Sequence, residues 1–219
     1  MTRMWSRFVG TGLMLFLAGC TSSPIHYYTL VPPVTGSIAG PDSKTGDSSS
    51  TLVAVSPPFE LLPVSVPAQV DQPQLVVRQG GQAVVLLDGE RWIAPLGDEV
   101  RGALSADLAR KLHSQDVTGL PESDKPLLRI KLDLRRFDSL PGSYALIEGT
   151  WSVRILHAAE RGALACTSRI SEAVGPGYDA LVQGHQRAIG QLATQIAGVA
   201  RSLGSGKKPA CPVPQAVPE

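Results

Sequence analysis

The sequence of 219 residues is poor in aromatic side chains, in charged side chains and in cysteine. Aromatic residues make up 5% and charged residues 18% of the chain, and 20 Lys and Arg residues nearly balance 19 Asp and Glu residues. No excess of positive charge is therefore available to neutralise phosphates along an extended surface, which argues against nucleic-acid binding. The 43% of hydrophobic residues is close to the average for soluble globular domains, so we expect a folded core.

Motifs for catalysis and for metal or phosphate binding are also missing. The chain has no Gly-x-Ser-x-Gly motif, and the segment Gly204–Lys208 lacks the early glycine and the Ser or Thr of a phosphate-binding loop. The histidines show no His-Glu-x-x-His spacing, and each is better explained as a solvated or core imidazole. They are His26, His113, His157 and His185. We therefore expect no enzyme, no metal site and no cofactor.

The apolar run at the amino terminus is too short to cross a bilayer. It extends from Phe8 to Ala18, about eleven residues, whereas a spanning helix needs about 20. Arg3 and Arg7 precede it, as positive residues precede the apolar part of secretory signals. We interpret residues 1–19 as a signal peptide, whose removal lowers the formal charge from +1 to −1.

The apolar run ends in Leu17-Ala18-Gly19-Cys20, which resembles the lipobox of bacterial lipoproteins. The resemblance implies a diacylglycerol on the Cys20 thiol, cleavage just before it and acylation of the new terminus, so that residues 20–24 form a lipidated terminus. Acyl chains contribute about 0.8 kcal/mol per buried methylene, enough together for permanent membrane attachment. In bacterial lipoproteins, a residue other than Asp after the lipidated cysteine, here Thr21, is compatible with export to the outer membrane. We therefore expect the protein at the periplasmic face of that membrane. The alternative, an ordinary core cysteine, fits poorly because the run has no polar alternation.

The mature chain predicts one α+β domain over residues 25–203. Apolar residues alternate with polar ones over 128–134, 145–155 and 163–173, which predicts three antiparallel strands. Gly80-Gly81 between two β-branched runs predicts a hairpin. Helical periodicity predicts one helix that starts at Pro95 or Gly97 and carries its apolar residues as far as Leu112, and a second over 178–203. Further strands are expected at 27–30 and 52–55, a flexible insert at 36–50 and a disordered Pro-rich tail at 204–219. The expected architecture is a mostly antiparallel sheet with two main helices packed on it.

Cys166 and Cys211 remain after processing and leave two alternatives open. In an oxidising periplasm they can form a disulfide, which on the chain-entropy model would stabilise the fold by roughly 4 kcal/mol. Two unpaired thiols are about as well supported, because Cys211 lies in the Pro-rich tail, which shows no evident reason to dock.

Three further segments make a family resemblance specific. They are Tyr27-Tyr28-Thr29-Leu30, Pro67 to Arg78 and Arg91-Trp92-Ile93-Ala94-Pro95-Leu96. With the lipobox, they make the chain similar to the PqiC-type ABC-transport auxiliary lipoproteins over roughly residues 17–203. Gln72 stands where that family often has arginine, and Ile93-Ala94 replaces its usual Ala-Glu.

The resemblance implies a role and partners. Members are outer-membrane partners of an MCE-domain (PqiB-like) protein, in systems that move lipids between the two membranes and support envelope integrity. They tend to form homo-oligomeric rings that dock on the end of an MCE tunnel. A second hypothesis, from a different class, is a structural envelope lipoprotein or assembly factor without a transport role.

Aromatic residues near the anchored end are candidates for a partner or subunit interface. Tyr27 and Tyr28 point to opposite sides of one strand, so one ring faces inward and the other is free for a neighbour. Arg91 and Trp92 lie just before the first helix, where Trp92 either fills the core between sheet and helix or anchors an interface. The first role is the better supported of the two for Trp92.

Overall fold

The computed structural model describes residues 24–33, 56–121, 124–158 and 162–213. The expected signal peptide, Cys20, the insert expected at 36–50 and the strand expected at 52–55 lie outside these residues. In chain order the elements are β1 (His26–Tyr28), β2 (Phe59–Leu61), β3 (Gln74–Arg78), β4 (Val84–Trp92), α1 (Leu96–Leu112), β5 (Leu127–Leu140), β6 (Tyr144–Leu156), β7 (Ala163–Ala173) and α2 (Tyr178–Gly204).

The strands form two sheets, one of three strands in the order β1-β4-β3 and one of four in the order β2-β5-β6-β7. The antiparallel meander β5-β6-β7 is the one that period-two alternation predicts. The short strands β1 and β2 instead add in parallel to β4 and β5. The α+β class is thus confirmed, with its strands divided between two mixed sheets.

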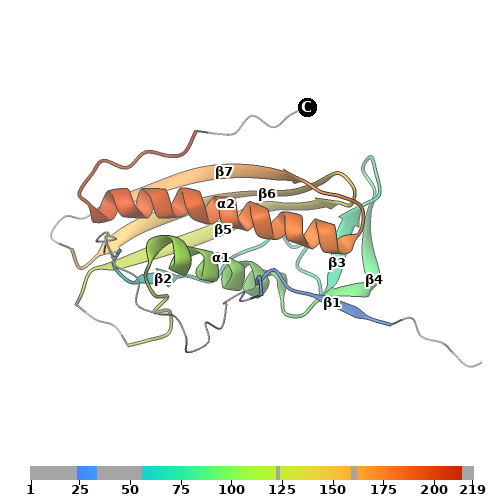
Figure 1. Ribbon diagram of the computed structural model, residues 1–219, viewed down its shortest axis with the longest axis horizontal. Helices are drawn as coiled ribbons and strands as arrows, with labels where there is room; N and C mark the ends of the chain where they lie inside the picture. Colours follow the sequence, from blue (N-terminus) through green and yellow to red (C-terminus); the bar gives the residue numbers. More distant parts are fainter. Residues whose placement is uncertain (1–23, 34–55, 122–123, 159–161, 214–219) are drawn as a thin grey trace, which may run out of the picture.

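The hairpin of β3 and β4 turns at the predicted glycines. Gly80 and Gly81 have φ values of 97° and 55°, a left-handed conformation that glycine adopts without a steric penalty. The side chains of Leu75 and Val77 face inward, whereas Val84 and Leu86 on the partner strand are exposed. The hairpin stands at one end of the longer sheet (Figure 1).

The helix α1 begins after Pro95 and ends at His113. Asp98 and Glu99 lie in its first turn and Arg110 and Lys111 in its last, which suits the helix dipole at both ends. Along α1, the side chains of a leucine and valine stripe are buried, as the sequence predicts for a core face. They are Leu96, Val100, Leu104, Leu108 and Leu112.

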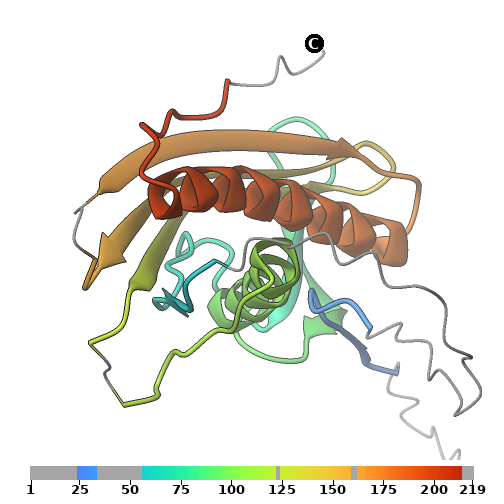
Figure 2. The same ribbon diagram turned by 60° about the vertical axis from the view of Figure 1, so that its left-hand side comes forward.

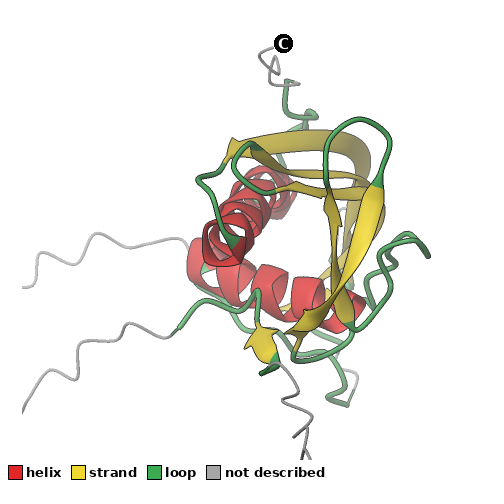
Figure 3. Ribbon diagram, turned by 90° about the vertical axis from the view of Figure 1, so that its right-hand side faces the viewer, coloured by secondary structure: helices red, strands yellow, loops and turns green. Residues whose placement is uncertain are grey.

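The helix α2 runs lengthwise along β5, β6 and β7 (Figures 1 and 2). A methyl group at Gly184 would lie 2.2 Å from Cγ1 of Val174 and 3.0 Å from Cβ of Ala145, so glycine allows the close contact between this helix and the sheet. Seen from the end, strands occupy two sides of the core and helices the other two (Figure 3). Side chains from both sheets and both helices form the main core cluster.

Neither helix of the described chain is both long enough and apolar enough to span a membrane.

Candidate functional site

The residues after the predicted lipidation site are built into the fold. Cys20 itself is outside the described residues, and the described chain starts at Pro24. Two residues later β1 pairs in parallel with the end of β4, where His26 lies beside Glu90 and Tyr28 beside Trp92. We call residues 24–31 the strap.

Buried contacts hold the strap against α1 and α2. The Glu99 carboxylate, itself buried, accepts hydrogen bonds from the Thr29 hydroxyl at 2.8 Å and from the Leu30 amide at 2.7 Å. The Leu30 side chain is fully buried in the core. From α2, the Gln186 side-chain amide donates to the Thr29 carbonyl at 3.1 Å. The strap is therefore a structural part of the domain.

The two tyrosines of the strap face opposite sides, as the sequence predicts. Tyr27 is 61% exposed, whereas Tyr28 is half-buried near Glu90. Burial, together with the nearby Glu90 carboxylate, raises the pKa of the Tyr28 phenol above its ordinary value. Tyr28 is thus neutral throughout the physiological pH range, and of the two rings Tyr27 is the one available to a partner.

Arg91 and Trp92 also face opposite sides of β4. Arg91 is the register partner of Tyr27 and lies on the outer side, half-exposed. Trp92 is only 6% exposed and meets Phe137 edge-to-face, with ring centroids 6.1 Å apart. Trp92 therefore fills the core, and its ring is not accessible as an interface anchor.

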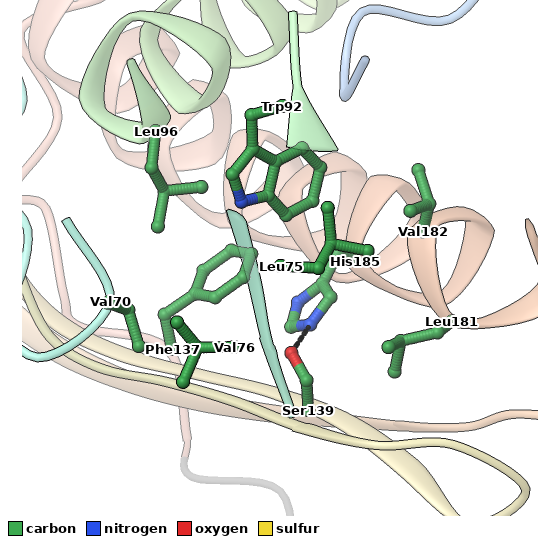
Figure 4. A pocket seen from close by; sticks show the side chains of 10 residues that line it. All are labelled: Val70, Leu75, Val76, Trp92, Leu96, Phe137, Ser139, Leu181, Val182 and His185. Carbon is green, nitrogen blue, oxygen red and sulfur yellow. Dashed lines mark hydrogen bonds between the residues drawn. The ribbon is translucent and has the colours of Figure 1, made fainter. Parts of the chain in front are cut away.

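Beside the buried rings of Trp92 and Phe137 lies a pair of a serine and a histidine that the sequence does not reveal (Figure 4). Ser139 Oγ lies 2.8 Å from His185 Nε2, and the imidazole stacks on Phe137 with centroids 3.9 Å apart. His185 Nδ1 has no hydrogen-bond partner within the described residues. Burial lowers the pKa of His185 to about 3, so its imidazole is neutral at pH 7.

This pair has little room for chemistry. The cavity it lines with Trp92 and Leu96 is about 10 Å³, about the space that one water molecule needs. A nucleophilic serine needs an approach for substrate, and this one is closed by packed side chains. The geometry fits a buried polar pair with a structural role in the core. No group of three or more potential metal ligands occurs among the described residues.

Cys166 and Cys211 form a disulfide in the structure, with Cα atoms 5.6 Å apart. Cys166 lies in β7, and the bond fixes the chain that follows α2 to this strand. The segment 205–213 of the predicted disordered tail therefore has a fixed point on the sheet. The disulfide joins residues 45 apart in sequence, so the local sequence of the Pro-rich tail could not predict it.

The three segments on which the family resemblance rests meet at one place in the fold. Tyr28 is the register partner of Trp92, and the Trp92 amide donates to the Pro73 carbonyl at 2.9 Å. The Ile93 amide in turn donates to the Tyr28 carbonyl at 2.9 Å. Residues far apart in sequence thus build one structural unit, the β1-β4-β3 sheet and the start of α1.

A family model described as "ABC-type transport auxiliary lipoprotein component" matches residues 41–197, more than half of the chain. The chain belongs to this family. Membership confirms the resemblance that the sequence suggests, although the matched range starts after the strap. No curated protein matches the sequence.

Two solved structures share the fold of this auxiliary lipoprotein. An uncharacterised protein is 19% identical with a TM-score of 0.58, over 80% of this chain and 97% of its own. A protein from Xanthomonas campestris, of a domain family of unknown function, is 18% identical with a TM-score of 0.53, over 70% of this chain and 90% of its own. At these identities the likeness concerns the fold alone.

Proposed function

We propose that this auxiliary lipoprotein is anchored by acyl chains on Cys20 at the periplasmic face of the outer membrane. There it acts as a non-catalytic subunit of an MCE-type intermembrane lipid-transport system. The observation that carries the proposal is family membership in a chain whose lipobox is followed within six residues by a strand of the folded domain.

The position of the strap supports anchoring at Cys20. Ile25 is the fifth residue after Cys20, so the two are at most about 18 Å apart when the chain between them is fully extended. A domain confined so close to one membrane meets a partner in the same envelope at an effective concentration in the millimolar range or so. A modest interface with an MCE-domain protein is then sufficient for stable docking.

The buried chemistry of the domain supports a non-catalytic role. The Ser139 and His185 pair lies in the core, and the cavity beside it holds about one water molecule. The energy for transport comes from the ATPase of such a system, so the lipoprotein needs only to bind and to position. Ring formation, which the family resemblance implies, would place several copies around one transport path.

Crosslinking in intact cells tests the function. The full-length chain carries a photocrosslinker at an exposed position and is purified with its adducts, alongside a Cys20→Ser variant. We expect an MCE-domain protein among the adducts, and a soluble periplasmic product from Cys20→Ser. Crosslinks only to peptidoglycan or porins, with lipid asymmetry intact after deletion of the gene, would instead support a structural envelope lipoprotein.

A further inference from the structure

An exposed apolar face lies at the anchored end of the chain. Side chains alternate across β1 and β4, and the register of Tyr27 with Arg91 places both on the outer side. The same alternation places Ile25 and Ile93, which adjoin the two strands, on that side. Ile25 is 47%, Tyr27 61% and Ile93 67% exposed. We call these four residues the strap face.

The strap face cannot move independently of the domain. The Ile93 amide is bonded to the Tyr28 carbonyl, and Glu99 holds the next two residues of the strap from the start of α1. The Leu30 side chain is fully buried. The orientation of the strap face is therefore the orientation of the whole domain.

The chain that precedes the strap face is short. Only residues 21–24 lie between Cys20 and Ile25, so Ile25 stays within about 18 Å of the acylated residue. A flexible tether of tens of residues would let any side of the domain face the membrane. This tether restricts the side next to the bilayer to the one from which the strap enters.

We propose that the strap face rests on the lipid surface in which Cys20 is anchored. Tyr27 lies at the headgroup level, where tyrosine is enriched in membrane-contacting proteins. Ile25 and Ile93 contact the boundary between the headgroups and the acyl chains, and Arg91 faces lipid phosphates. The inference rests on the proposed acylation of Cys20 and adds to it a defined orientation of the domain.

The orientation has a consequence for the partner. The strap face adjoins the start of α1, a helix of 17 residues that ends at Leu112. At about 1.5 Å per residue, the far end of α1 lies about 25 Å from its start beside the strap face. The end of the molecule where β6 ends, β7 begins and α2 ends then points into the periplasm (Figure 1).

Site-specific photocrosslinking in vesicles tests the contact. The mature acylated protein is reconstituted in vesicles of phosphatidylethanolamine and phosphatidylglycerol, with Tyr27 or Ile93 replaced by p-benzoylphenylalanine. After irradiation, mass spectrometry identifies what is attached. We expect phospholipid adducts at both positions.

Leu120 offers the matched control. It is similarly exposed, at 64%, but follows the far end of α1. We expect no lipid adduct above background when it carries the same photocrosslinker. Equal adduct yields at the three positions, or crosslinks at 27 and 93 to a second copy in place of lipid, would overturn the inference.

The mass of the intact protein separates the inference from the function on which it rests. An acylated Cys20 without lipid adducts at 27 and 93 removes the strap-face contact and leaves the anchored function standing. An unmodified Cys20 removes both. The substituted positions are exposed, and an unchanged thermal unfolding midpoint confirms that each variant is folded.

Discussion

His185 couples the stability of the domain to pH. Burial lowers its pKa to about 3, whereas in the unfolded chain a histidine titrates near 6.5. Between these values the unfolded chain binds a proton that the folded domain does not. The unfolded state therefore gains relative stability as the pH falls from about 6.5 towards 3. The full contribution of His185 to stability is present only above this window.

Replacing His185 by Gln is expected to weaken this pH dependence. The wild-type free energy of unfolding contains a His185 contribution that falls by up to about 1.4 kcal/mol per pH unit within the window. The variant lacks this part, so its stability changes less between pH 7 and pH 5, whatever its absolute value. Urea unfolding at the two pH values measures the difference.

The control for this prediction is His113→Asn. His113 is exposed and has a left-handed backbone, which asparagine tolerates. The variant should keep the wild-type pH dependence. If His185→Gln kept it too, the protonation of His185 would not explain the acid sensitivity of the domain.

Replacement by alanine is expected to have opposite effects on stability at two glycines of α2. A Cβ at Gly184 would lie 2.2 Å from Cγ1 of Val174, so Gly184→Ala should destabilise the fold by about 1–3 kcal/mol through overpacking. A Cβ at Gly198 meets nothing within 4 Å, so Gly198→Ala should stabilise it by up to about 1 kcal/mol through helix propensity. Urea unfolding compares the two. Equal effects would show that the contact at Gly184 is not as close as described.

At the scale of elements, the attachment of the strap depends on one carboxylate. Glu99 accepts two hydrogen bonds from the strap in a buried position, and hydrogen bonds to a charged group contribute about 1.5–3 kcal/mol each. Glu99→Ala is therefore expected to loosen residues 24–31 before it affects the rest of the domain. Hydrogen exchange should show faster exchange at the Leu30 amide, with little change in β5 and β6.

Asp98→Ala is the matched control, because Asp98 lies in the same helical turn but is exposed. It removes the same charge near the start of α1 without touching the strap. Exchange at Leu30 should then stay close to wild type. Equal acceleration in both variants would assign the effect to the helix dipole and not to the hydrogen bonds of Glu99.

The elements with a strong local pattern could be predicted from the sequence. Alternation over seven residues of β5 and over about eleven in β6 and β7 predicts these strands, and helical periodicity predicts α1 and α2. The strand β2 has only three residues, Phe59 to Leu61, within a Pro-rich stretch. Its parallel partner β5 begins 66 residues later, at Leu127. Nothing local in the sequence encodes that pairing, so the division into two sheets could not be predicted.

The same limit applies to the candidate site. The opposite orientation of Tyr27 and Tyr28 follows from strand geometry and was predictable. The hydrogen bonds that Thr29 and Leu30 donate to Glu99, and the one between Ser139 and His185, connect residues 70, 69 and 46 apart. Such pairs depend on how the helices lie on the sheets. A carboxylate in the first turn of α1 is explained by the helix dipole alone, which hides its second role.

At the scale of the whole molecule, the two sheets share one core. Trp92 from one sheet and Trp151 from the other belong to the same cluster of buried residues. At the edge of that cluster, Arg78 of β3 donates to Asp138 of β5 at 2.6 Å. Although burial would raise the pKa of Asp138, hydrogen bonds from Arg78 and Arg136 hold it below its ordinary value. The ion pair thus joins the sheets at neutral pH.

A shared core predicts that the domain unfolds in a single step. A chain that begins at Cys20, the proposed mature terminus, lacks Trp5 and contains Trp92 and Trp151, one buried in each sheet. In Trp151→Phe the fluorescence reports on the β1-β4-β3 sheet, and in Trp92→Phe on the four-stranded sheet. Within each variant, the urea midpoint from fluorescence should coincide with that from far-UV circular dichroism, as for a two-state transition. The disulfide must stay oxidised in both experiments. An earlier fluorescence transition in Trp151→Phe alone would show that the sheet carrying the strap unfolds separately from the four-stranded sheet, against the shared core.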